Sequence, residues 1–208
     1  MRFKPGDAID SDHCTALQHE FLRCQDAFRD FETSATIMIL EGENRLLAYK
    51  TYNAYSRFVH HLYEFLIAAR ARDIGDTSPL RADQAERFIA GAAQRILTRK
   101  RKAIQNGTAP SWENHISYYP EEIPLDFSKE FRLFRNKAYG HATHERAKLN
   151  SSTFYEKNHK YLYMLYRDCL DWWGLRGGEF PDLKEITEFS VVIKKTRPGV
   201  ENQLDNAG

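Results

Sequence analysis

The sequence predicts an all-α protein, an up-and-down bundle of about five helices followed by a short C-terminal extension. Two observations carry this prediction. Apolar residues recur at steps of three and four along most of the 208-residue chain, which is the period of one helical face. Glycine and proline gather in short stretches between these segments, where they separate helices. Hydrophobic residues make up 42% of the chain and aromatic residues 13%, so a packed core of one domain is expected.

The first two helices are predicted to pair as a hairpin. Residues 1–10 are expected to form a flexible arm, and Ser11 is expected to cap a helix whose apolar seam includes Leu17, Phe21 and Phe28. Gly42 should end that helix. A second long helix, from about Asn44 to Asp73, is apolar on two sides, which is typical of a central helix.

A third helix is predicted for residues 81–106, and its last turns are strongly basic. The basic residues are Arg95, Arg99, Lys100, Arg101 and Lys102. They allow two interpretations, a grip on RNA phosphates or an ordinary solvated face favoured by the helix dipole, and the second is the more common arrangement. The loop 107–125 follows and carries Trp112, His115, Tyr118 and Tyr119. These rings suit either stacking on bases or anchoring of the loop to the core.

The remaining elements are a fourth helix over residues 127–140, a fifth from about Ser152 to Trp173, and the extension 175–208. The β-branched run from Thr187 to Lys195 predicts a strand. The last residues are predicted to be a disordered tail. The helical domain itself should therefore span residues 11–174.

Charge and cysteine content limit the function classes. The net charge is +1, so a nucleic-acid site would have to be a local patch. Three cysteines without a Cys-x-x-Cys pair indicate neither a disulfide framework nor a cysteine zinc site. No apolar run has membrane-spanning length, and the first residues lack the apolar core of a signal peptide. We therefore expect a cytoplasmic protein with no membrane partner, and we predict neither a metal nor a cofactor.

The most informative segment is the fourth helix. Phe127, Phe131, Phe134 and Ala138 follow one another at steps of four, three and four, so they form one apolar stripe. Arg135 lies at another angle, and His141 follows it six residues later. On an unbroken helix these two would not share a face. A glycine at position 140 can end the helix and bring His141 back towards Arg135.

With Arg135, Asn136 and His141, the chain resembles the HEPN superfamily of small helical domains. The signature of that family is an arginine, usually followed by a polar residue, with a histidine about five to seven positions after the arginine. The resemblance implies a metal-independent endoribonuclease of toxin–antitoxin or abortive-infection (phage-defence) type. It also implies a homodimer whose two motifs face one another across the interface, with RNA as substrate and an antitoxin as a possible partner.

The resemblance assigns catalysis to Arg135, Asn136 and His141. Histidine is the general acid or base on the ribose 2′-oxygen or the 5′-oxygen, arginine stabilises charge on the phosphorus, and asparagine orients the phosphate or the imidazole. The products would be a 2′,3′-cyclic phosphate and a 5′-hydroxyl. Further candidates for substrate binding are the polar residues around the motif, which are Arg132, Lys137, Tyr139, His144 and Arg146.

Three alternatives remain open. Arg135 could be a surface arginine and His141 a residue that caps the helix, on a domain that binds RNA or a protein without cutting. His141, His144 and Glu145 could supply part of a metal-dependent hydrolase, although a catalytic zinc needs three protein ligands. The sequence His60-His61-x-x-Glu64 on the second helix matches no complete zinc pattern, and one of its histidines could face the motif.

Overall fold

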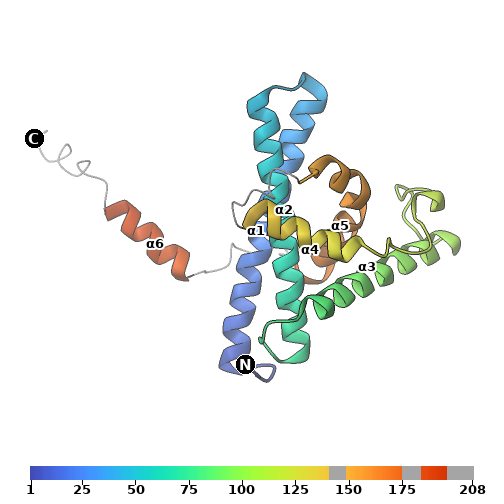
Figure 1. Ribbon diagram of the computed structural model, residues 1–208. Coiled ribbons are helices and arrows are strands. Elements are labelled where there is room, and N and C mark those ends of the chain that lie inside the picture. Colours follow the sequence, from blue (N-terminus) through green and yellow to red (C-terminus); the bar gives the residue numbers. More distant parts are fainter. Residues whose placement is uncertain (141–148, 175–183, 196–208) are drawn as a thin grey trace, which may run out of the picture. The chain divides into compact units, whose positions relative to one another are not determined.

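The computed structural model describes residues 1–140, 149–174 and 184–195, and within these ranges it contains six α-helices and no β-strand. The helices are α1 (Ala8–Glu41), α2 (Arg45–Ile74), α3 (Ala82–Gln105), α4 (Phe127–Arg135), α5 (Ser151–Trp173) and α6 (Lys184–Lys195) (Figure 1). The chain divides into two units, Met1–Gly174 and Leu175–Gly208. The predicted all-α class is confirmed.

Helices α1 and α2 form the long antiparallel hairpin of the first unit (Figure 1). The side chain of Asn44 caps α2 by accepting a hydrogen bond of 2.9 Å from the backbone N–H of Leu47. Gly75 ends α2 with φ at 63°, and a Cβ at this position would lie 2.9 Å from the carbonyl oxygen of Phe3. Glycine is therefore required there both by the left-handed backbone and by the lack of space.

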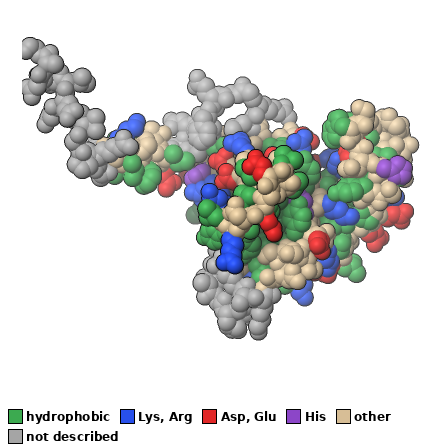
Figure 2. Space-filling view, turned by 90° about the horizontal axis from the view of Figure 1, so that it is seen from above, with side chains coloured by type: hydrophobic (Ala, Val, Ile, Leu, Met, Phe, Trp, Pro, Cys, Tyr) green, Lys and Arg blue, Asp and Glu red, His purple; other side chains and the backbone are tan. Residues whose placement is uncertain are grey.

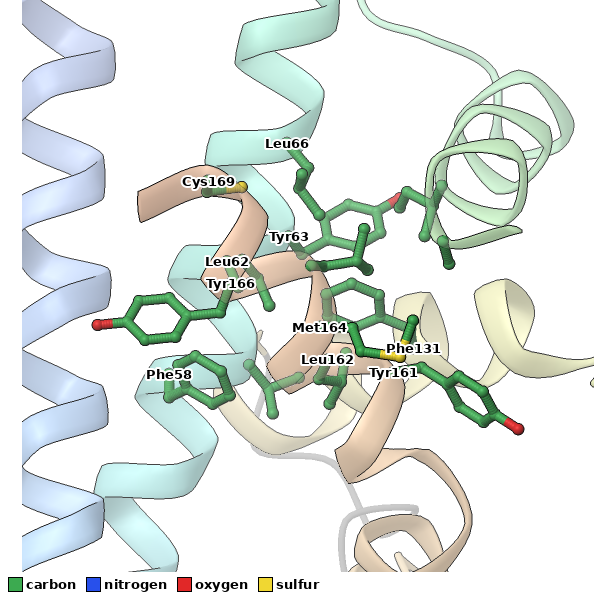
Figure 3. Packing of buried hydrophobic residues seen from close by; sticks show 14 of the residues in the cluster. Phe58, Leu62, Tyr63, Leu66, Phe131, Tyr161, Leu162, Met164, Tyr166 and Cys169 are labelled. Carbon is green, nitrogen blue, oxygen red and sulfur yellow. The ribbon is translucent and has the colours of Figure 1, made fainter. Parts of the chain in front are cut away.

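The core is built around α2, which contacts α1, α3, α4 and α5. Phe58 and Leu62 of α2 are fully buried and meet Phe131 of α4 and Leu162 of α5 in one apolar cluster (Figure 3). Two sides of α2 are thus covered by other helices, as the two apolar stripes in its sequence predict. Helix α4 is held in this core by contacts with α2, α3 and α5.

The N-terminal residues differ from the flexible arm predicted from sequence. Arg2 pairs with Asp76 in an isolated β-bridge, and the side chain of Phe3 is buried. Helix α1 begins at Ala8 with Asp7 as its N-cap, so the prediction of Ser11 as cap is wrong. The local signals Pro5, Gly6 and Asp7 mark a turn, but only the tertiary pairing with the end of α2 shows that the segment is anchored.

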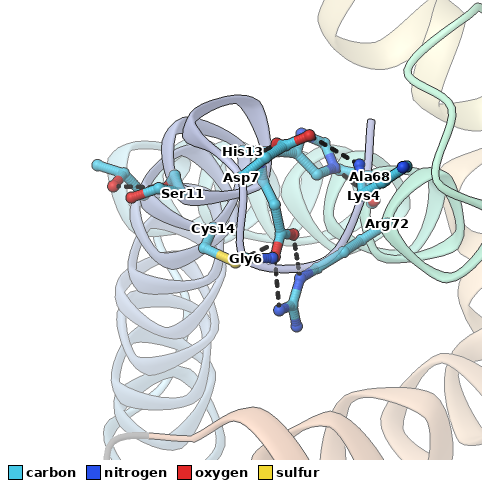
Figure 4. A network of polar contacts seen from close by, with 10 residues as sticks. Lys4, Gly6, Asp7, Ser11, His13, Cys14, Ala68 and Arg72 are labelled. Carbon is cyan, nitrogen blue, oxygen red and sulfur yellow. Dashed lines mark hydrogen bonds and ion pairs between the residues drawn. The ribbon is translucent and has the colours of Figure 1, made fainter. Parts of the chain in front are cut away.

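An ion pair between the half-exposed Arg72 and the buried Asp10 joins the start of α1 to the end of α2. Arg72 Nε donates to Asp10 Oδ1 over 2.8 Å, and the Asp10 side chain also accepts from the backbone N–H of Gly6 over 2.8 Å. Figure 4 shows Arg72 reaching from α2 towards Gly6 and Cys14. The Arg72 guanidinium and the Gly6 N–H lower the pKa of Asp10 from 3.8 to about 2.

Replacement of Asp10 by asparagine is expected to cost more stability near neutral pH than in acid. A carboxylate whose pKa is depressed in the folded state stabilises the fold above its unfolded-state pKa, and that contribution disappears as the pH falls towards about 2. Urea unfolding of Asp10→Asn and wild type at about pH 6 and about pH 3 measures this difference. Asp12→Asn, at an exposed position of the same helix, is the control. An equal loss of stability at both pH values would contradict the lowered pKa of Asp10 in the folded state.

The basic end of α3 serves mainly to hold the loop 107–125 and α5. Lys100 pairs with Glu113 of the loop over 2.6 Å, Arg99 pairs with Asp168 of α5, and Arg101 donates to the carbonyl oxygen of Tyr119. Tyr119 is buried and anchors the loop, whereas Trp112 is 74% exposed. Three of these basic side chains have partners within the fold. The basic end of α3 is therefore neither a purely solvent-exposed face nor a set of unpaired cations that could bind phosphates.

The strand predicted from Thr187 to Lys195 is wrong, because residues 184–195 form helix α6. Val191, Val192 and Ile193 favour a strand by local propensity. Ile186, Phe189 and Ile193, however, recur at steps of three and four, which is helical spacing. Their side chains are exposed. Among the described residues, no helix combines the length and apolar character needed to cross a membrane.

Candidate functional site

Helix α4 carries Arg135, the first residue of the predicted motif, and packs into the core by its apolar stripe. Phe127, Phe131, Phe134 and Ala138 are each at most 2% exposed, so the predicted stripe is confirmed. Phe134 stacks on Phe154 of α5 with ring centres 4.0 Å apart. The chain then continues as a π-helical turn, η2 (Asn136–Gly140). The helical segment thus extends through Gly140, and a π turn widens it immediately after Arg135.

Arg135 projects from the end of α4 onto α2. Its Nη2 donates to Glu64 Oε1, its Nη1 donates to Asn136 Oδ1 over 2.7 Å, and its guanidinium carbon lies 5.3 Å from the centre of the Tyr63 ring. The Arg135 side chain is 30% exposed. Its Nε is buried and has no hydrogen-bond partner among the described residues. The guanidinium is therefore held on three sides and still keeps N–H groups for another acceptor.

Two histidines of α2 lie in the same region. The pKa of His60 is lowered from 6.5 to about 4, first by burial and then by its neighbours His61 and Arg135, against an opposing effect of Glu20. His60 is consequently neutral at pH 7. The Nδ1 of His61 lies 2.7 Å from Glu20 Oε1 of α1.

These contacts define a polar cluster of Glu20, His60, His61, Glu64 and Arg135, contributed by α1, α2 and α4. It lies at the edge of the apolar interface between α1 and α2, in which Leu17, Phe21 and Leu62 are buried. From sequence, the His60-His61-x-x-Glu64 pattern pointed to part of this cluster, since positions four apart share a helical face. Glu20 had no signal of its own, because only the pairing of α1 with α2 brings it to His61.

Only some of the other predicted site residues lie in the described part of the chain. Asn136 contacts Arg135 as described, but Arg132 donates from its Nε to Glu86 of α3 over 2.8 Å and so faces another helix. Lys137 is half-buried in the π turn. The side chain of Tyr139 and the residues His141, His144, Glu145 and Arg146 lie outside the described part of the chain. The structure therefore brings Arg135 and Asn136 together, and the Arg135–His141 pairing remains a prediction.

A second feature is a groove of about 850 Å³ between α3, the loop 107–125 and α5. Its aromatic residues Trp112, Tyr118 and Tyr163 are 74%, 47% and 42% exposed, and Lys160 Nζ lies 5.6 Å from the centre of the Tyr118 ring. Its charges are nearly balanced. The cations are Arg99, Lys100, Lys160 and Arg167, and the anions are Glu113, Asp168 and Asp171. Figure 2 likewise shows basic side chains among acidic ones on the face seen from above.

No family model matches this chain, and comparisons with the curated proteins and with the solved structures find no match. The functional conclusion therefore depends on the chemistry of the site itself.

Proposed function

We propose that the protein is a metal-independent endoribonuclease of HEPN type. It cuts RNA by attack of the ribose 2′-oxygen on the adjacent phosphorus, and it leaves a 2′,3′-cyclic phosphate and a 5′-hydroxyl. The setting would be a toxin–antitoxin or phage-defence system in the cytoplasm, and an antitoxin would be a further partner. The observation that carries the proposal is the fixed guanidinium of Arg135, which lies six residues before His141 at the end of a helix anchored in the core.

The reaction needs one group to remove a proton and another to return one. A general base takes the proton of the 2′-hydroxyl, the 2′-oxygen bonds to phosphorus, and the bond from phosphorus to the 5′-oxygen breaks as a general acid protonates that oxygen. His141 supplies one of these roles, because imidazole exchanges protons near neutral pH. The same residue of a second copy supplies the other, so the proposal includes a homodimer with facing motifs.

Arg135 would stabilise the negative charge that develops on the phosphoryl oxygens. Glu64, Asn136 and Tyr63 hold its guanidinium before substrate arrives, and a charge that is already oriented costs little reorganisation during the reaction. Asn136, next to it, would orient the phosphate or the imidazole. Tyr139, His144, Arg146 and Lys137 are the remaining candidates for contacts with RNA. Arg132 would have to leave Glu86 of α3 before it could make such a contact.

One observation favours a second function, an RNA-binding or protein-interaction module on the same fold that does not cut. Glu64 already neutralises Arg135, so a phosphate has to approach a guanidinium that is paired with a carboxylate. Exposed aromatic rings with Lys160 and Arg167 in the groove could hold single-stranded RNA by stacking and charge. This module would bind RNA without producing new ends.

Cleavage of a mixed RNA in excess EDTA distinguishes the two functions. The proposal predicts new ends that a polynucleotide kinase labels directly, since a 5′-hydroxyl needs no prior dephosphorylation. Light scattering of the same sample should give the mass of a dimer. RNA binding by a folded protein without cleavage would support the second function, and cleavage that EDTA abolishes would support a metal-dependent hydrolase instead.

A further inference from the structure

Glu20, His60 and His61 each offer one metal-ligating atom, and these atoms all lie within 4.8 Å of one another. The carboxylate comes from α1 and both imidazoles come from α2. The Glu20 side chain is 19% exposed and that of His61 is 12% exposed. The group is thus partly enclosed but still reached by solvent, and it belongs to two helices that the core holds firmly against each other.

The two imidazoles are spaced as they would be around one ion. Their ring centres lie 5.1 Å apart and the ring planes are inclined by 78°. Two imidazole nitrogens about 2.0–2.1 Å from a tetrahedral ion place their ring centres roughly 5 Å apart. Neighbouring positions on a helix point about 100° apart, so this separation requires side-chain conformations that bring both rings to the same side.

We propose that Glu20, His60 and His61 form a binding site for a divalent transition-metal ion of the zinc class, with one coordination position left open. Two histidines and one carboxylate are a known donor set for zinc.

Each carboxylate near the group has an arginine partner. Glu64 pairs with Arg135, and Oε2 of Glu20 lies 4.0 Å from Nη1 of Arg23 on the same helix. Arg23 is 54% exposed, so its contact with Glu20 is weak and a bound ion can replace it. Glu20 would exchange its contact with His61 Nδ1 for a bond to the ion or use its second carboxylate oxygen.

This site goes beyond the proposed ribonuclease and does not depend on it. Cleavage in EDTA tests the chemistry of Arg135 and His141 without any ion, whereas metal binding is measured without RNA. A negative result for RNA cleavage would not contradict the metal site, and a negative result for metal binding would not contradict the ribonuclease.

The test is a titration of the full chain, free of tags and first depleted of metal by EDTA and gel filtration, with ZnCl₂ in a calorimeter. We expect one ion per chain with micromolar or tighter affinity, and a rise in the unfolding midpoint on zinc addition. Glu20→Gln and His61→Gln should each weaken binding by about 10-fold or more. His115→Gln, at an exposed loop histidine, should bind as wild type does.

Cobalt(II) provides a second measurement, because it reports the ligand atoms. The proposal predicts visible absorption bands typical of a four- or five-coordinate ion, without the near-ultraviolet band of a thiolate ligand. Circular dichroism confirms that each variant is folded, and His60→Gln replaces any variant that is not. The proposal is overturned if wild type binds no zinc below about 100 μM, if the cluster variants bind as tightly as wild type, or if a thiolate band shows that a cysteine is the ligand.

Discussion

Arg135→Ala is expected to lower the rate of RNA cleavage by about 100-fold or more, because preorganised groups that stabilise transition-state charge have effects of this size. The guanidinium is fixed by Glu64 and Asn136 and so meets the developing charge without reorganising. The measurement is the single-turnover rate on a labelled RNA in EDTA, which separates chemistry from product release.

Arg135→Lys and Arg87→Ala are the matched variants for this experiment. Lysine keeps the charge but loses the planar fork, so its rate should remain well below that of wild type. Arg87 lies on α3 and pairs with the exposed Asp83 over 2.8 Å, so its replacement should leave the rate unchanged. Glu64 is 33% exposed, so loss of its partner should not unfold the protein. Full activity in folded Arg135→Ala would place the active site elsewhere.

Phe65→Ala is expected to reduce the free energy of unfolding by about 3–5 kcal/mol, the usual cost of removing a buried phenylalanine ring. Phe65 is fully buried on α2, and its ring centre lies 4.6 Å from that of Phe21 on α1 and 5.6 Å from that of Trp172 on α5. The cavity would therefore open where three helices meet.

Urea unfolding followed by circular dichroism measures this loss, with Tyr49→Ala as the control. Tyr49 lies on the same helix and is 63% exposed, so its replacement should change the stability by about 0.5 kcal/mol or less. A loss below about 1 kcal/mol for Phe65→Ala would show that α1, α2 and α5 do not share this core.

Elements with a local signal were predictable from the sequence. The stripe from Phe127 to Ala138 identifies the buried face of α4, and Asn44 and Gly75 mark the two ends of α2 within one residue. The helical period of the chain was enough for the fold class, because a helix that must bury one face repeats its apolar residues every three to four positions.

Features that depend on contacts between distant residues were not predictable. Glu64 and Arg135 are 71 positions apart, and Glu20 and His61 are 41 apart. The cations at the end of α3 gave no sign that their partners would be Glu113 and Asp168. In α6, Val191 and its neighbours favour a strand by local propensity, but the helical spacing of Phe189 and Ile193 matches the observed structure.

The central claim, that Arg135 and His141 act as one catalytic unit, is tested most directly by the double variant Arg135→Ala/His141→Ala beside both single variants. Residues that act together in one transition state lose their effects non-additively. We therefore expect the double variant to cleave RNA in EDTA no more slowly, within about 10-fold, than the slower single variant. If the double variant loses rate by the product of the two single-variant factors, or if it cleaves RNA as fast as wild type, Arg135 and His141 do not act as one catalytic unit.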